Sequence, residues 1–360
     1  MNGKLTPLRR PRVFCGEAFP WPPISELRDG AEVVGCYLIR ERRRGEARTG
    51  KAYLDLRLGD RSGTINAKVW DDVDRLEGLS PPEAIVGVRG RVEMYQGKVQ
   101  LIVRLLEPLE VDDADLELFL PSTRRDRVEL ERELEAWITS VADRPLNALL
   151  ERCLGRQSAL GRAFRLHPAA KSNHHACIGG LLEHSVSVAG ACHRLAEHYA
   201  AQGAAVDRDL LMTGALLHDV GKVRELNAGG GFAYTHEGQL LGHILLGLQI
   251  VAREAEAVPG LSAERLLLVQ HLIASHQGRL EWASPKIPQL LEGLILHYAD
   301  DLDSKMNPAA ALVAGAGEGE WTVYDRHLER ALFRPRTEPD PDTPDDPRAP
   351  TADAFDLFGS

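Results

Sequence analysis

The sequence predicts a multidomain protein in which a small β-barrel is followed by an all-α domain. Its 360 residues exceed the about 250–300 that a single domain usually holds. Apolar and polar residues alternate in the first third of the chain, whereas apolar residues recur at helical spacing beyond residue 128. All 13 histidines lie after residue 166, so the helical part also carries the candidate chemistry.

Residues 31–110 are expected to form the barrel. Leu54, Leu56 and Leu58 alternate with polar residues, and the pattern resumes at 65–69 after a glycine-containing turn. A second pair of strands is predicted at 86–92 and 99–103, with a first strand near 33–40. Five strands in about 80 residues indicate a barrel of the OB type, and an SH3-like barrel is the alternative.

The segment 111–127 is predicted to be a linker, with Ser122 or Thr123 as the N-cap of the next helix. From 128 to 333, residues such as Leu130, Leu134 and Ile138 recur at three- and four-residue steps, which predicts helices. Residues 1–30 are an N-terminal extension. Residues 334–360 are rich in proline and acidic side chains, which predicts a disordered tail. Because residues 337–360 carry a net charge of −6 out of the total of −10, the total charge says little about partners.

Composition also sets expectations for the compartment. The five cysteines are odd in number and form no CxxC pair, which favours reduced thiols in a cytoplasm. No run of 18 apolar residues is present, so no membrane span is expected. The basic N-terminus lacks an apolar segment, so no secretory signal is expected.

Six residues of metal-ligand type stand at the ends of predicted helices or on their apolar edges: His184, His218, Asp219, His243, His276 and Asp300. Imidazole and carboxylate suit Mn, Fe, Co, Ni or Zn. Because His218 and Asp219 point about 100° apart, the carboxylate could bridge two metals that clamp a phosphoryl group. Lys222 follows one turn later and is expected to neutralise a phosphate oxygen, so Asp219 and Lys222 are the predicted catalytic residues.

A lone histidine on an apolar helix face is more often a core residue than a ligand. An ordered set of six residues of ligand type favours a metal site over that interpretation. Among the other histidines, His175 and His271 are the two expected to support the ligands from behind.

The chain resembles the HD-domain metal-dependent phosphohydrolases and, more closely, the YhaM-type 3′–5′ exoribonucleases. The resemblance spans about residues 23–330 and rests on the following segments: FLPSTRRDR at 119–127, HHACIGGLLEHS at 174–185, HDVGK at 218–222, THEGQLLGHI at 235–244, EWASPKIP at 281–288 and LHYADDLDSKM at 296–306.

This resemblance implies an OB-fold followed by an HD domain, and hydrolysis of single-stranded RNA to nucleoside 5′-monophosphates. Single-stranded DNA is a second candidate substrate. It implies two divalent metals, with manganese favoured and Fe, Co, Ni, Zn or Mg as alternatives, held by the six residues above. Two departures bear on the ligands. Gln277 stands where relatives tend to have a histidine, and Asp301, where asparagine is common, competes with Asp300.

Strand binding by the barrel would need basic and aromatic side chains. The candidates are Tyr53, Lys68, Trp70, Arg89, Tyr95 and Lys98. Residues 31–110 hold 14 basic and 13 acidic residues, so the barrel is not strongly basic. The run Arg42–Arg44 is either a loop that tracks phosphates or a solvated hairpin.

Two other functions compete with the exonuclease. The first is a nucleotidase or cyclic-nucleotide phosphodiesterase whose barrel serves only for packing or assembly. The second is a binding protein with a relic metal pocket. The sequence does not determine whether the protein forms an oligomer.

Overall fold

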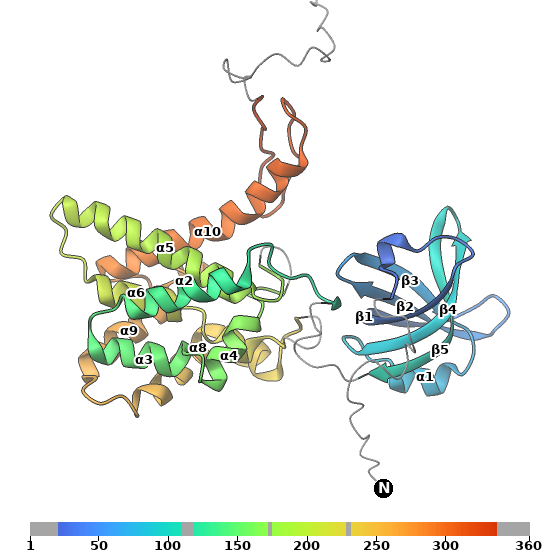
Figure 1. Cartoon of the computed structure of the whole chain (residues 1–360), viewed down its shortest axis with the longest axis horizontal. Helices are drawn as coiled ribbons and strands as arrows, with labels where there is room; N and C mark the ends of the chain where they lie inside the picture. The colour runs from blue at the N-terminus through green and yellow to red at the C-terminus, as the bar shows by residue number, and fades with distance from the viewer. Residues whose placement is uncertain (1–20, 110–117, 172–174, 228–231, 337–360) are drawn as a thin grey trace, which may run out of the picture. The chain divides into compact units, whose positions relative to one another are not determined.

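The computed structural model describes residues 21–109, 118–171, 175–227 and 232–336 (Figure 1). Parts of the predicted N-terminal extension and linker, and nearly all of the predicted tail, lie outside these residues. Within the described ranges, no helix is long and apolar enough to cross a membrane. The chain divides into two compact units, residues 1–304 and 305–360.

The N-terminal part is a closed five-stranded barrel. Its strands are β1 (Glu32–Glu46), β2 (Ala52–Asp60), β3 (Gly63–Val69), β4 (Ile85–Tyr95) and β5 (Lys98–Leu109), in the order β1-β2-β3-β5-β4. All neighbouring pairs are antiparallel except β3 and β5. The short helix α1 (Val73–Leu79) lies between β3 and β4 in the chain. This topology is that of an OB-fold, which confirms the prediction and excludes the SH3-like alternative.

The alternation seen in the sequence corresponds to the inner and outer faces of the barrel. Leu54, Leu56 and Leu58 are fully buried, and Ala67 and Leu101 fill the same core. Successive side chains of a strand point to opposite faces. The polar residues between these positions are therefore directed outward.

Of the two alternatives for Arg42–Arg44, the phosphate-tracking loop is wrong and the solvated hairpin is confirmed. These residues continue strand β1, where each pairs with a residue of β2. Arg42 Nη1 donates to the backbone carbonyls of Glu77 and Ser80, and Arg44 forms ion pairs with Asp74 and Glu77 of α1. Two of the three guanidinium groups therefore secure α1 instead of forming a loop.

The rest of the chain is mainly helical (Figure 1). Its helices are α2 (Arg127–Thr139), α3 (Arg144–Leu154), α4 (Ala159–Leu166), α5 (Gly180–Ala201), α6 (Arg208–Leu217), α7 (Lys222–Glu225), α8 (His236–Ala255), α9 (Ala263–Ser275) and α10 (Leu291–Gly315). One core unites most of them, and the predicted apolar positions Leu130, Leu134 and Ile138 are fully buried in it.

Side-chain caps set where several helices begin. The carboxylate of Asp126, not the predicted Ser122 or Thr123, accepts from the backbone N–H groups of Val128 and Glu129 at the start of α2. Asp207 caps α6 by accepting from Leu210 N at 2.9 Å. This cap matters for the site, because α6 ends at His218 and Asp219.

The described part of the second unit is not wholly helical. After α10 ends at Gly315, isolated β-bridges pair Trp321 with Phe333 and Asp325 with Arg330. The predicted all-α region therefore ends near residue 315 instead of 333, because the following residues form antiparallel backbone pairs.

Candidate metal centre

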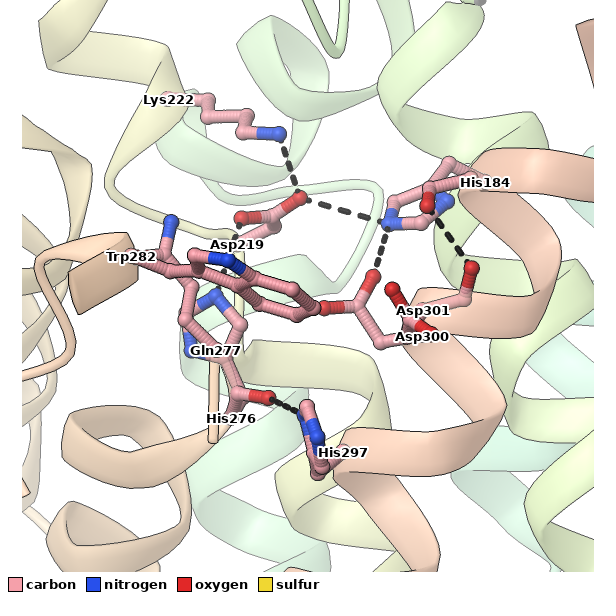
Figure 2. A pocket seen from close by; sticks show the side chains of 10 residues that line it. His184, Asp219, Lys222, His276, Gln277, Trp282, His297, Asp300 and Asp301 are labelled. Atoms are coloured by element: carbon pink, nitrogen blue, oxygen red, sulfur yellow. Dashed lines mark hydrogen bonds and ion pairs between the residues drawn. The ribbon is translucent and has the colours of Figure 1, made fainter. Parts of the chain in front are cut away.

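The structure brings together all six residues predicted as ligands, from five different helices. His184 lies in the first turns of α5, His218 caps the C-terminus of α6, and Asp219 follows it. His243 lies within α8, His276 caps the C-terminus of α9, and Asp300 lies in α10. His184, Asp219, His276 and Asp300 line one cavity of about 230 Å³ (Figure 2).

One carboxylate oxygen of Asp219 faces the first group of donors. Oδ2 lies 3.4 Å from Nε2 of His184 and 3.4 Å from Nε2 of His218. Asp300 Oδ1 lies 3.1 Å and 3.8 Å from the same two nitrogens. The ligand atoms of His184, His218 and Asp219 all lie within 4.8 Å of one another, and Asp300 Oδ1 lies beside the two imidazoles.

The other oxygen of Asp219 faces the second group. Oδ1 lies 3.4 Å from Nε2 of His243 and 3.8 Å from Nε2 of His276. Both Asp219 Oδ1 and His243 Nε2 are buried without a hydrogen-bond partner among the described residues. Buried polar atoms in proteins are normally satisfied, so these two atoms fit a site that holds a cation.

The four histidines present the same nitrogen to Asp219. In each ring Nδ1 is the atom that contacts an oxygen acceptor: Asp303 Oδ2 for His184 (2.8 Å), the Ala215 carbonyl for His218 (2.9 Å), Glu225 Oε1 for His243 (3.2 Å) and the Ile273 carbonyl for His276 (2.8 Å). In the neutral rings these acceptors assign the proton to Nδ1 and leave a lone pair on Nε2. Four lone pairs and two carboxylates then face one another, which is favourable only around positive charge.

The charges of the site depend on one another. Burial alone would raise the pKa of Asp219, but Lys222 and His218 hold it well below its usual range. Burial lowers the pKa of His184, yet its hydrogen bonds to Asp219, Asp300 and Asp303 raise the pKa well above the ordinary value. Since a ligand histidine must be neutral, metal binding at His184 has to displace a proton.

Among the described residues that line the cavity, Lys222 is the only lysine or arginine. Its Nζ lies 2.7 Å from Asp219 Oδ2. Burial lowers the pKa of Lys222, and the neighbouring Asp219 more than offsets this effect, so the pKa is raised. The ammonium therefore stays charged beside the carboxylate.

Two glycines allow the helix ends to meet. A Cβ on Gly221 would lie 1.9 Å from the His243 carbonyl oxygen, so only glycine lets this segment approach α8. Gly242 has a φ of 71°, a left-handed conformation that favours glycine. The resulting kink turns the backbone N–H of His243 toward Glu225 Oε1, 2.9 Å away.

The sequence analysis missed the residues that hold the ligands from behind. Asp303 accepts from His184 Nδ1 and Ser187 Oγ, and its Oδ2 lies 3.3 Å from His175 Nε2. The position of Asp303, one helical turn after Asp300, could have indicated this role from the sequence. His175 thus supports the ligands as expected. His271 does not, because its Nε2 accepts from the backbone of Gln289.

Two residues of this chain differ from those that the family tends to have. These residues, Gln277 and Asp301, both line the same cavity (Figure 2). Asp300, at 3.1 Å from His184 Nε2, is the carboxylate that faces the histidines.

The barrel residues predicted to bind nucleic acid fall into separate places. The rings of Tyr53 and Trp70 lie 5.0 Å apart, and Lys68 Nζ lies 4.4 Å from the Tyr53 centroid. Lys68 also pairs with Asp55 at 3.0 Å. These three candidates form one cluster on β2 and the end of β3.

The other three barrel candidates lie on β4 and β5. Tyr95 and Lys98 face each other across the β4–β5 turn, and Arg89 is exposed on β4. Strand register also places two further basic residues of the barrel. Arg43 is opposite Asp55, and Arg91 is opposite Ile102, which is itself paired with Lys68.

Comparison with known proteins adds the family context. The HD domain model matches residues 181–305, and the OB-fold nucleic acid binding domain model matches residues 38–109. The 3′-5′ exoribonuclease YhaM of Bacillus subtilis (strain 168) is 36% identical over 308 residues, which cover 85% of this chain and 96% of that protein. The protein of that name from Bacillus licheniformis is 36% identical over 312 residues, covering 86% and 97%. A crystal structure of a replication protein A domain from Methanococcus maripaludis covers 25% of this chain and 94% of its own, at 23% identity and a TM-score of 0.22.

Proposed function

Because this chain belongs to the YhaM family of 3′–5′ exoribonucleases, we propose that it shortens single-stranded RNA from the 3′ end and releases nucleoside 5′-monophosphates. Single-stranded DNA stays a second candidate substrate. One observation carries the proposal: four histidines turn the lone pairs of Nε2 toward the two oxygens of the buried Asp219. That arrangement suits divalent cations, the cofactors that many phosphodiester hydrolases use.

The donor atoms form two sets, one at each oxygen of Asp219, and each set would hold one cation. His184, His218 and Asp300 would hold the first cation together with Oδ2. His243 and His276 would hold the second together with Oδ1. Nitrogen and oxygen donors without thiolates suit manganese, which we propose as the resident metal. The bound cations supply the Lewis acidity that activates water and stabilises charge on the phosphate.

Lys222 and Asp219 are the proposed catalytic residues of the chain itself. The carboxylate of Asp219 lies between the two groups of histidines and contacts both. Lys222 Nζ, 2.7 Å from this carboxylate, lies in the wall of the same cavity. A phosphate that enters the cavity would attract this ammonium, which would stabilise the charge that develops on its oxygens.

The barrel is proposed to hold the strand. Tyr53 and Trp70 offer ring faces on which bases stack, and stacking is tolerant of sequence because every base has a π-face. Lys68, Arg89 and Lys98 would contact phosphates, and Tyr95, which is 59% exposed, offers a further ring. Family membership favours this function over a nucleotidase or cyclic-nucleotide phosphodiesterase, for which the barrel would only pack.

The test is a denaturing gel with 5′-labelled single-stranded RNA and Mn²⁺. Wild-type protein should produce a ladder that shortens from the 3′ end. Asp219→Ala should leave the RNA intact, because it removes the carboxylate shared by both groups of histidines. Glu151→Ala, a change at an exposed acidic residue of α3, is the matched control and should give the wild-type ladder. Intact RNA with the wild type, alongside hydrolysis of a nucleotide or cyclic dinucleotide, would overturn the proposal.

A further inference from the structure

Trp282 is a large aromatic residue at the edge of a cavity that is otherwise lined by polar and charged groups. It lies in a short 3-10 helix, Leu280–Trp282, and lines the same cavity as Asp219, Lys222 and His276 (Figure 2). The residue is 42% exposed. Tryptophan is highly buried on average, so an indole left partly exposed beside a candidate metal centre suggests a ligand that covers it.

The local structure holds the indole in place. Arg279 lies 4.8 Å from the ring centroid in a cation–π contact. The backbone N–H groups of Trp282 and Ser284 both donate to the Arg279 carbonyl, at 3.1 and 3.2 Å, and Ser284 Oγ donates to the Lys286 carbonyl at 2.7 Å. Ala283 closes the turn in a left-handed conformation with φ 63°. A platform held this way loses little conformational freedom when a ligand stacks on it.

The cavity has room for only a small part of a strand. Its volume of about 230 Å³ falls below the roughly 300–1,000 Å³ of typical ligand pockets. A 3′–5′ exonuclease places the last phosphodiester at the cations, so the terminal nucleotide must lie beside them. Its phosphate would meet the charged groups, and its base needs an aromatic or apolar surface nearby.

We propose that Trp282 is the stacking platform for the 3′-terminal nucleobase, with Arg279 packed against the indole. This inference rests on the proposed exonuclease function and extends it by naming a subsite for the base of the leaving nucleotide. Every base has a π-face, so the indole would stack on any terminal nucleobase whatever its identity.

The test compares two RNAs with each of four proteins. One 5′-labelled RNA ends in an ordinary nucleotide and the other ends in an abasic ribose. The proteins are wild type, Trp282→Ala, Trp282→Phe and the control Trp321→Ala, which removes a tryptophan that is 67% exposed and does not line the cavity. The measured quantity is kcat/KM for removal of the last unit, with Mn²⁺ content and circular dichroism measured on every protein.

Trp282→Ala should lower kcat/KM on the ordinary RNA by about 5- to 150-fold, which is the roughly 1–3 kcal/mol of one base–aromatic stack converted at about 1.4 kcal/mol per tenfold. On the abasic RNA the same variant should match wild type within about twofold, since no base is left to stack. Trp282→Phe should restore most of the loss on the ordinary RNA, and Trp321→Ala should behave as wild type.

Three outcomes would overturn the inference. If Trp282→Ala loses the same factor on both RNAs, the indole serves the fold or the metal centre and not the base. If it processes both as wild type does, the indole does not bind the strand. If wild type degrades neither RNA, the exonuclease function itself fails, and the platform fails with it. The first two outcomes do not contradict the proposed exonuclease function.

Discussion

Replacing Asp303 by asparagine should weaken metal binding, although Asp303 is not placed among the ligands. Its Oδ2 is 2.8 Å from His184 Nδ1, and this contact directs the lone pair of Nε2 toward Asp219. Ser187 Oγ also donates to Asp303, and His175 Nε2 lies 3.3 Å away. Asparagine keeps the size of the side chain. It removes the negative charge. Its NH₂ group also cannot accept the hydrogen bonds that the carboxylate oxygens accept.

The expected loss is set by how strongly this contact orients His184. Removing such an outer partner of a ligand histidine typically costs about 10- to 100-fold in metal affinity, or about 1.4–2.8 kcal/mol. The assay is a Mn²⁺ binding isotherm by titration calorimetry on the full chain. Asp74→Asn is the matched control, because Asp74 is an exposed aspartate of α1 whose side chain is 88% accessible.

Two results would refute this reasoning. The first is an unchanged Mn²⁺ affinity in Asp303→Asn at wild-type thermal stability, which would show that Asp303 does not orient His184. The second is an equal loss in Asp74→Asn, which would show that the effect is one of overall charge.

The remaining predictions concern the fold, its pH response and the barrel. Gly221→Ala should lower the free energy of unfolding by about 1–3 kcal/mol, because its Cβ would lie 1.9 Å from a carbonyl oxygen. Gly190→Ala, in the interior of α5, should raise it by about 0.5–1 kcal/mol, because a Cβ there meets no neighbouring atom. Thermal melts measure both changes. Burial would raise the pKa of Asp207, but hydrogen bonds from Arg265 and from the N–H of Leu210 lower it. The stability it provides is therefore present above the ordinary carboxyl pKa and lost as pH falls through the lowered one. Asp207→Ala should cost about 0.5–2 kcal/mol near neutral pH and flatten that acid limb in urea titrations. Tyr53→Ala should weaken RNA binding by about 1–3 kcal/mol in fluorescence anisotropy, measured in an Asp219→Ala background.

Each of these predictions has a result that contradicts it. Equal melting temperatures for the two glycine variants would show that the helix ends do not meet as closely as described. An acid limb that is as steep in Asp207→Ala as in wild type would assign the acid sensitivity to other carboxylates. Unchanged RNA affinity in Tyr53→Ala would remove the cluster on β2 and β3 from the binding surface.

The sequence was sufficient to predict the class of each part of the chain, because local patterns carry that information. The alternation of Leu54, Leu56 and Leu58 predicts a strand with one buried face, and the structure confirms it. It was not sufficient to decide between a loop and a solvated hairpin for Arg42–Arg44, which the structure places in the β1–β2 hairpin. There the contacts of Arg42 and Arg44 with α1 outweigh local composition, and α1 lies more than 25 residues away in the chain.

The same division holds at the candidate metal centre. Sequence determined which residues are of ligand type and that they lie near helix ends or on the apolar edges of helices, since the helical period and adjacent residues such as His218 and Asp219 are local features. Only the tertiary structure decided that the two oxygens of Asp219 face different pairs of histidines, and that Asp303 and Glu225 hold two of those rings from behind. The physical reason is distance along the chain. Hydrogen-bond direction and the side of a carboxylate that faces a given ring depend on how five helices pack, and no local pattern encodes that packing.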